Sequence, residues 1–138
     1  MKITPNADGK ITVITARTAE ELLHDSLSSL DHEEAWLIYL TKRGILLGTE
    51  MISKGTFDST AIDGRTVMRY ALLHNAGAVV LLHNHPSGEC TPSPSDIRMT
   101  DKIRQACNLM GIPLMDHIII AEDKFYSFCD EKTYKHIQ

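Results

Sequence analysis

Two histidines and an aspartate stand at a spacing that suits a metal ion. The chain reads His83-x-His85, then seven residues, then Ser93-x-x-Asp96. Imidazole nitrogens and carboxylate oxygens are ligands that zinc accepts, and three of them leave one corner of a tetrahedron open for water. Catalytic zinc sites keep that corner open, whereas structural sites close it with a fourth protein ligand. The spacing therefore predicts one Zn²⁺ per chain, bound by His83, His85 and Asp96, that activates water for attack on a carbonyl.

A strand and a helix start would bring these side chains together. Residues 78–83 are apolar up to the histidine, which is typical of a central buried strand, and side chains at i and i+2 of a strand point the same way. Pro94 suits the first position of a helix over 94–110, so Ser93 becomes its N-cap and Asp96 lies in its first turn. Asp96 has the alternative role of complementing the helix dipole. The joint pattern favours the metal site.

A hydrolytic zinc site also needs a general base, usually a glutamate. Glu50 lies inside a predicted strand over 45–53, where a lone glutamate is disfavoured unless it faces solvent or a site. Glu89, in the exposed loop between the ligands, is the alternative base. The other glutamates considered are assigned to polar helix and loop faces: Glu20, Glu21, Glu33 and Glu34.

The remaining histidines and cysteines have simpler expected roles. His117 is expected to support the fold or the ligands rather than to close the open corner. Cys90 lies within the metal loop and is interpreted as an incidental thiol. Four histidines on helical or terminal polar stretches are expected to be solvated: His24, His32, His74 and His136.

Composition limits the class of protein. The 138 residues carry a net charge of −4 without clusters of Lys or Arg, so nucleic-acid binding gains no support. The sequence shows no signal peptide and no membrane span, and its three widely spaced cysteines suit reduced thiols, which together predict a cytoplasmic protein. We expect one domain over 16–138, preceded by a leader over 1–15 that adds at most an edge strand.

The order of elements predicts the fold class. Helices and strands alternate, and a hairpin closes the chain, which indicates a three-layer α/β/α domain with a mixed sheet. The predicted helices span 18–30, 62–76 and 94–110, and the predicted strands span 35–40, 45–53, 78–83, 117–122 and 123–128.

Longer segments resemble a known family. The order Glu, His-x-His, seven residues, Ser-x-x-Asp resembles the JAMM (MPN-plus) metalloprotease motif, and four segments are similar to the RadC-like family that carries it: SKGTFD (53–58), NAGAVVLLHNHPSG (75–88), PSPSD (92–96) and LMDHIII (114–120). The resemblance implies a JAMM/cytidine-deaminase-like fold and cleavage of an amide or isopeptide bond in a peptide or protein substrate. It makes His83, His85 and Asp96 zinc ligands, Ser93 a hydroxyl that stabilises the oxyanion, and Glu50 the general base.

Two other functions compete with this interpretation. Longer RadC-like proteins carry an N-terminal helix-hairpin-helix segment, a DNA-binding type of module for which this chain has no room, and the family name implies a DNA-repair-associated accessory protein without protease activity as the alternative. A zinc deaminase is rejected, because its signature is His-x-Glu followed by Pro-Cys-x-x-Cys, whereas the pair in the metal motif here is His-x-His and the sequence has no Cys-x-x-Cys.

Overall fold

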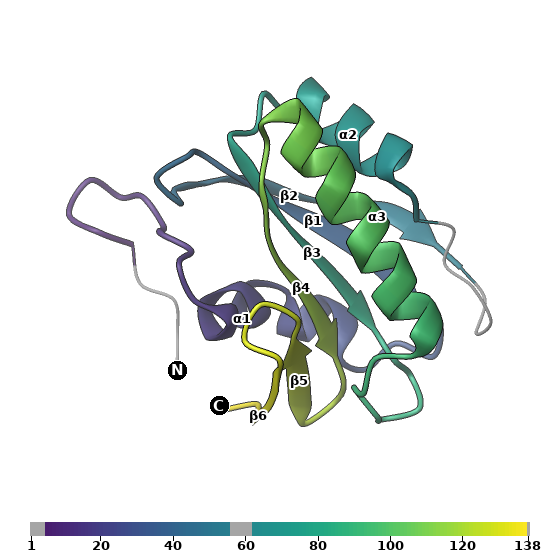
Figure 1. Ribbon diagram of the computed structural model, residues 1–138. Helices are drawn as coiled ribbons and strands as arrows, with labels where there is room; N and C mark the ends of the chain where they lie inside the picture. Colours follow the sequence, from purple (N-terminus) through teal and green to yellow (C-terminus); the bar gives the residue numbers. More distant parts are fainter. Residues whose placement is uncertain (1–4, 56–61, 138) are drawn as a thin grey trace.

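The structure is a computed structural model that describes residues 5–55 and 62–137 (Figure 1). Its helices are α1 (Ala16–Leu27), α2 (Gly64–Leu73) and α3 (Pro94–Met110). Its strands are β1 (Glu34–Leu40), β2 (Leu46–Lys54), β3 (Ala78–Asn84), β4 (Leu114–Ile120), β5 (Lys124–Ser127) and β6 (Lys132–Lys135). Within these ranges the strands form one sheet in the order β2-β1-β3-β4-β5-β6.

The sheet is mixed and lies between two layers of helices. β3 pairs with β4 in parallel, and the other neighbouring strands pair antiparallel. Helix α1 packs on one face and helices α2 and α3 on the other (Figure 1). The predicted three-layer α/β/α class with a mixed sheet is confirmed.

The central strand β3 explains why the sheet can hold a site at its end. All seven of its residues are buried, as an apolar strand between two helical layers must be. Val79 and Leu81 join the core under α2 and α3, whereas Val80 and Leu82 join the core under α1. His83 continues the first series, so it leaves the core on the α2/α3 side where the strand ends.

Several boundaries differ from the sequence-based expectation: α1 ends at Leu27 rather than at residue 30, α2 spans Gly64–Leu73 rather than 62–76, and β4 spans Leu114–Ile120 rather than 117–122. Helix α1 begins at Ala16 rather than at residue 18, because the hydroxyl of Thr15 caps it by accepting from the amide of Thr18 at 3.1 Å. The segment before it is more than a leader: Thr12 bridges Ile45 antiparallel, and the side chain of Val13 is only 4% exposed. The expected edge-strand contact therefore exists, as a single bridge.

The end of the chain holds a strand that the sequence analysis did not predict. β6 is four residues long, is mostly exposed, and among the described strands pairs with β5 alone. The segment 53–58, used above for the family resemblance, lies partly outside the described residues. None of the described helices has the length and apolar character needed to cross a bilayer.

Candidate metal centre

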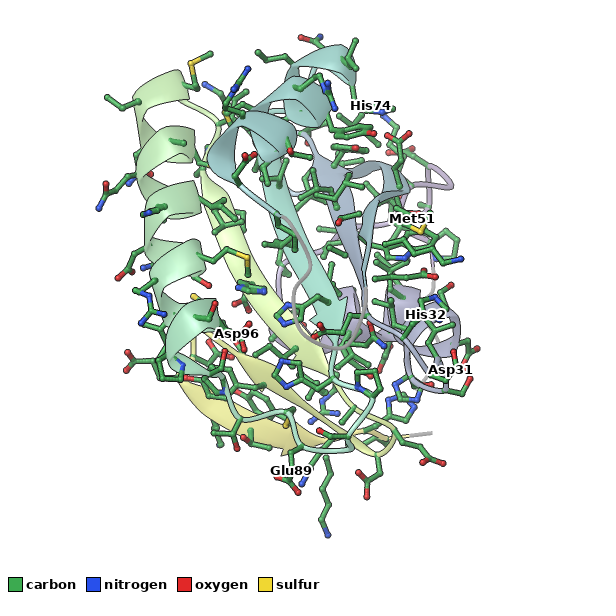
Figure 2. All side chains as sticks on the ribbon, turned by 90° about the vertical axis from the view of Figure 1, so that its right-hand side faces the viewer. Asp31, His32, Met51, His74, Glu89 and Asp96 are labelled. Atoms are coloured by element: carbon green, nitrogen blue, oxygen red, sulfur yellow. The ribbon has the colours of Figure 1, made fainter. Side chains whose placement is uncertain are left out.

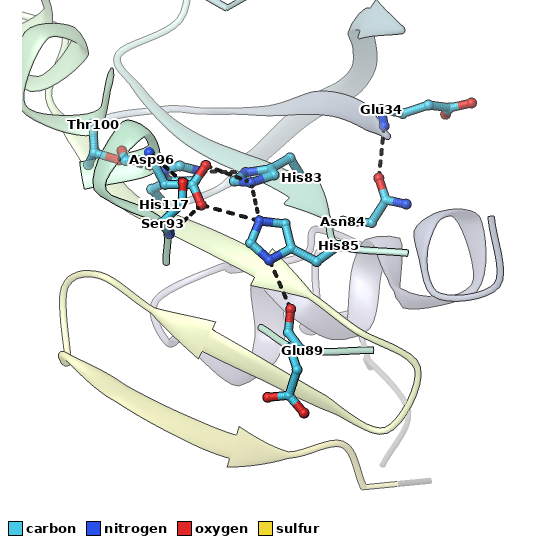
Figure 3. Close-up of polar contacts among 9 residues, drawn as sticks. All are labelled: Glu34, His83, Asn84, His85, Glu89, Ser93, Asp96, Thr100 and His117. Carbon is cyan, nitrogen blue, oxygen red and sulfur yellow. Dashed lines mark hydrogen bonds and ion pairs between the residues drawn. The ribbon is translucent and has the colours of Figure 1, made fainter. Parts of the chain in front are cut away.

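The structure brings His83, His85 and Asp96 to one point, where β3 ends and α3 begins (Figure 3). The Nε2 atoms of the two histidines lie 3.2 Å apart. Asp96 Oδ1 lies 3.4 Å from His83 Nε2, and Asp96 Oδ2 lies 3.2 Å from His85 Nε2. Ligands at about 2.0–2.1 Å from a tetrahedral zinc ion stand about 3.3 Å apart, so these separations fit zinc.

The loop between the ligands orients His85. Its Nδ1 lies 2.8 Å from the carbonyl oxygen of Glu89, which only accepts hydrogen bonds, so Nδ1 carries a proton. The loop turns through Gly88, whose φ of +90° suits glycine. With Nδ1 fixed as the donor, Nε2 is the nitrogen that His85 turns toward the other two side chains.

His83 is oriented by a chain of three hydrogen bonds (Figure 3). Its Nδ1 lies 2.7 Å from His117 Nε2, and His117 Nδ1 lies 2.6 Å from the hydroxyl of Thr100. Thr100 donates its proton to the carbonyl oxygen of Asp96 at 2.7 Å, so it accepts from His117 Nδ1. His117 Nε2 must then accept from His83 Nδ1, which leaves His83 Nε2 as a bare nitrogen that faces the site.

His117 is fully buried, and its surroundings keep it neutral. Burial, followed by the nearby His83, lowers the pKa of His117 well below its ordinary value. The adjacent Asp116 holds the β4–β5 end together by accepting from the amide of Cys129 and the hydroxyl of Ser127 at 2.9 and 2.7 Å. His117 thus supports a ligand, as expected from the sequence.

Helix capping fixes Asp96. The Ser93 hydroxyl accepts from the Asp96 amide at 3.0 Å, and an Asp96 carboxylate oxygen accepts from the Ser93 amide at 2.8 Å, which closes a capping box. One carboxylate oxygen of Asp96 therefore caps the helix while the group also lies beside His83 and His85. The capping role and the metal-binding role of Asp96 are compatible. A hydroxyl can accept and donate together, so Ser93 keeps a proton to offer a ligand.

The three side chains polarise one another. Burial raises the pKa of Asp96, but the imidazoles of His83 and His85 beside the carboxylate outweigh burial and hold that pKa well below its usual range. Burial lowers the pKa of His85, but its bonds to Asp96 and the Glu89 carbonyl outweigh it and leave a raised pKa. The carboxylate thus stays charged, as a zinc ligand must be.

The carboxylate beside the two histidines is that of Glu33. One oxygen of Glu33 and one ring nitrogen each of His83 and His85 all lie within 4.8 Å of one another. The register explains this: Ala35 of β1 stands opposite His83, so Glu33, two residues earlier, stands level with His85 on the same face.

Backbone contacts hold Glu33 on both sides. The buried Asn84 side chain donates to the carbonyl oxygen of His32 and accepts from the amide of Glu34, both at 2.8 Å. The carbonyl oxygen of Glu33 itself accepts from the amide of Gly55 at 3.0 Å. Asn84, between the two histidines in sequence, therefore fixes the segment that carries the nearby carboxylate.

Glu50, which the sequence analysis predicted as the base, is not brought together with the three candidate metal ligands and has other partners. Its Oε1 accepts from the Tyr39 hydroxyl at 2.9 Å and lies 2.6 Å from His74 Nε2. His74, at the end of α2, is far from Asp96 along the molecule (Figure 2). Glu50 does face the α2/α3 side, but β2 is separated from β3 by β1, and Glu50 pairs with Leu37 rather than with the strand end.

The other loop candidates are also placed. The carboxylate of Glu89 points outward, where Lys124 Nζ approaches it at 3.3 Å (Figure 2). The side chain of Cys90 packs against Ile119 and Ala121, which suits the incidental thiol that the sequence predicted.

The α/β fold, with His83, His85 and Asp96 gathered at the end of β3, is that of a JAB-type domain. The RadC-like JAB domain family matches residues 13–134, so the chain belongs to this family. A UPF0758 protein of Porphyromonas gingivalis is 37% identical over 121 residues, covering 87% of this chain and 53% of that protein. The UPF0758 protein YeeS of Escherichia coli is 38% identical over 120 residues, covering 87% of this chain and 81% of YeeS.

A further UPF0758 protein, from Ruegeria pomeroyi, is 41% identical over 105 residues, covering 76% of this chain and 47% of that protein. The chain spans about half the length of several of these relatives, including those of Porphyromonas gingivalis and Flavobacterium johnsoniae, at 53% each. The names of these relatives state no activity, so membership of the family establishes the type of domain but not the reaction.

Proposed function

We propose that this chain is a JAMM-type zinc metallopeptidase that hydrolyses an amide or isopeptide bond in a peptide or protein. The single observation that carries the proposal is the set of three ligand separations between 3.2 and 3.4 Å, with the Glu33 carboxylate beside it. Zinc, when bound, polarises a carbonyl group and lowers the pKa of water. The donor set of two imidazoles and one carboxylate is that of catalytic zinc sites, which keep a position open for substrate.

The residues around the ligands supply the proton transfers. Glu33 takes a proton from the attacking water and returns it to the leaving amine, because its carboxylate stands beside His83 and His85 on a segment fixed by Asn84. The Ser93 hydroxyl donates a hydrogen bond to the oxyanion that develops on the carbonyl oxygen. These assignments move the base from Glu50 to Glu33 and keep Ser93 in its predicted role.

The DNA-associated alternative rests on the family name alone. A net charge of −4 gives no basis for phosphate binding, so the hydrolase is the function that the site supports better.

A peptide-library experiment tests the proposal. Zinc-loaded protein is incubated with a mixture of linear and lysine-branched peptides, and mass spectrometry detects cleaved products. We expect cleavage that stops on chelation and returns with zinc. Glu33→Gln should retain zinc and slow cleavage by about 10²–10⁴-fold, the usual contribution of a positioned base.

Glu50→Gln is the matched control, since it makes the same change on the same face of the sheet away from the ligands. It should cleave at nearly the wild-type rate. Cleavage that survives Glu33→Gln undiminished would remove Glu33 from the mechanism. A library left uncut by fully zinc-loaded protein would contradict the peptidase assignment.

A further inference from the structure

A second cluster of metal-ligand side chains lies on the opposite face of the sheet. Glu20 and His24 are one turn apart on α1, and His136 follows β6 at the end of the chain. One ligand atom from each lies within 4.8 Å of the other two. Figure 1 shows the C-terminal segment beside α1. Both histidines were expected to be solvated, but their side chains are only 9% and 12% exposed.

Glu20 is a fully buried carboxylate whose ion-pair partners among the described residues are two histidines. Its side chain is 0% exposed, and among the described residues no Lys or Arg forms an ion pair with it. His24 Nδ1 contacts one of its oxygens, and His136 Nδ1 lies 3.0 Å from the other. Burying a carboxylate is costly unless a cation and hydrogen bonds compensate for the lost water.

The two imidazoles lie against each other beside the buried carboxylate. Their rings stack face to face, with centroids 3.4 Å apart and planes at 4°. Two positive charges at this separation would repel each other strongly. A single divalent cation can instead be shared by the carboxylate and both rings, because a neutral imidazole offers a metal ion one bare nitrogen.

The ligands are held near one another by contacts that do not involve their rings. The amide of His136 donates to the carbonyl oxygen of Asp123 at 2.8 Å. Arg17, one turn before Glu20 on α1, donates to the carbonyl oxygen of Lys135 at 3.0 Å and lies over the ring of Phe125. The contact of 3.0 Å between His136 and Glu20 is close to the separation of about 3.3 Å expected between two zinc ligands.

We propose that Glu20, His24 and His136 form a second metal site, which binds zinc or a similar borderline divalent cation and fastens the C-terminal segment to α1. Its donors are again two imidazoles and one carboxylate, but they are nearly enclosed, so the site is structural. The chain then binds two metal ions, one more than the sequence predicted.

Metal content measured on full-length variants tests this proposal. After zinc loading and desalting, we expect two equivalents in the wild-type chain and one in the His83→Ala/His85→Ala variant, which disables the first site. Adding His136→Gln to that variant should leave none. His74→Gln is the matched control, since His74 also pairs with a glutamate but, among the residues that the structure describes, has no second imidazole on that glutamate. It should leave the remaining equivalent in place.

Ring NMR of the His83→Ala/His85→Ala variant gives an independent measurement that needs no change in the second site. One equivalent of zinc should shift the imidazole signals of His24 and His136 and leave that of His74 unchanged. The proposal is overturned if these two signals do not move, if the variant binds no zinc, or if a folded His136→Gln derivative still binds one equivalent.

Discussion

At the scale of single residues, the metal centre depends on which ring nitrogens carry protons. Thr100 donates to the backbone carbonyl oxygen of Asp96. This bond determines which atom donates in each of the other two hydrogen bonds, from His117 to Thr100 and from His83 to His117. The proton of a neutral His83 therefore lies on Nδ1, and its Nε2 is unprotonated without any rearrangement of the side chain. An aspartate carbonyl at the start of α3 therefore controls the tautomer of a histidine at the end of β3.

Thr100→Val tests that control. Valine keeps the shape of threonine but cannot accept a hydrogen bond from His117 Nδ1. The positions of the protons on His117 and His83 are then no longer fixed by Thr100. We expect zinc affinity to fall by about 10–100-fold, the usual effect of removing a hydrogen bond behind a ligand, with the helical signal unchanged. Competition titration with a chromogenic chelator measures the affinity. Thr49→Val, at an exposed position of β2, is the control. Equal zinc affinities in the two variants would show that the hydrogen bonds from Thr100 through His117 to His83 are not required for zinc binding.

The sequence indicated the proposed metal ligands but not the proposed base, and one physical reason accounts for both outcomes. His83, His85 and Asp96 are identified by local spacing, because a strand end and a helix start place them within fourteen residues. Glu33 joins them only through the β1–β3 register, which pairs residues about fifty positions apart. The alternation of side chains along a strand offered one signal. Glu33, Ala35 and Leu37 point to the same face of the sheet, so a glutamate just before this buried strand was expected on the face that carries His83.

At the scale of elements, boundaries were predictable where capping residues were unambiguous. The range 94–110 was correct for α3, since Ser93 and Pro94 begin it and Gly111 ends it with a φ of +69°. The start of α1 was placed too late because Thr15 and Thr18 both have the form of a cap. β6 escaped notice because a short, exposed edge strand carries no apolar pattern.

The β1–β2 hairpin contains a polar contact with a consequence at high pH. Tyr39 of β1 is almost fully buried and donates to Glu50 of β2. Burial, followed by the Glu50 carboxylate, raises the pKa of Tyr39 above its ordinary value of 10.0. A raised folded-state pKa means that this contribution to stability is complete below about pH 10 and is lost as pH rises toward the folded-state value, because the unfolded chain releases the proton first.

Tyr39→Phe should therefore flatten the alkaline part of the stability profile. The variant should lose about 1 kcal/mol at pH 8 with the hydrogen bond to Glu50, and the gap to wild type should narrow as pH rises above about 10. Urea unfolding at several pH values measures both effects. Parallel profiles for the two proteins would mean that Tyr39 titrates alike in the folded and unfolded chains.

At the scale of the whole molecule, the two proposed metal sites lie outside the apolar core. Two apolar clusters fill the spaces on either side of the sheet, and neither includes the ligands of the first centre or the proposed second one. The domain therefore differs from a zinc finger, in which metal binding supplies the free energy of folding.

Removing the metal with a chelator should leave the domain folded but make residues 132–137 less protected from hydrogen exchange. We expect the circular dichroism spectrum to be retained in excess chelator, while the thermal midpoint falls because the native state loses bound metal. Amide hydrogen exchange locates the effect: residues 132–137, joined to α1 through Arg17 and His136, should exchange faster, and β3 should stay protected because it is buried along its whole length. Loss of the helical signal would show that the core depends on the metal after all. Unchanged exchange at 132–137 would show instead that the Arg17 contact suffices to hold the end of the chain.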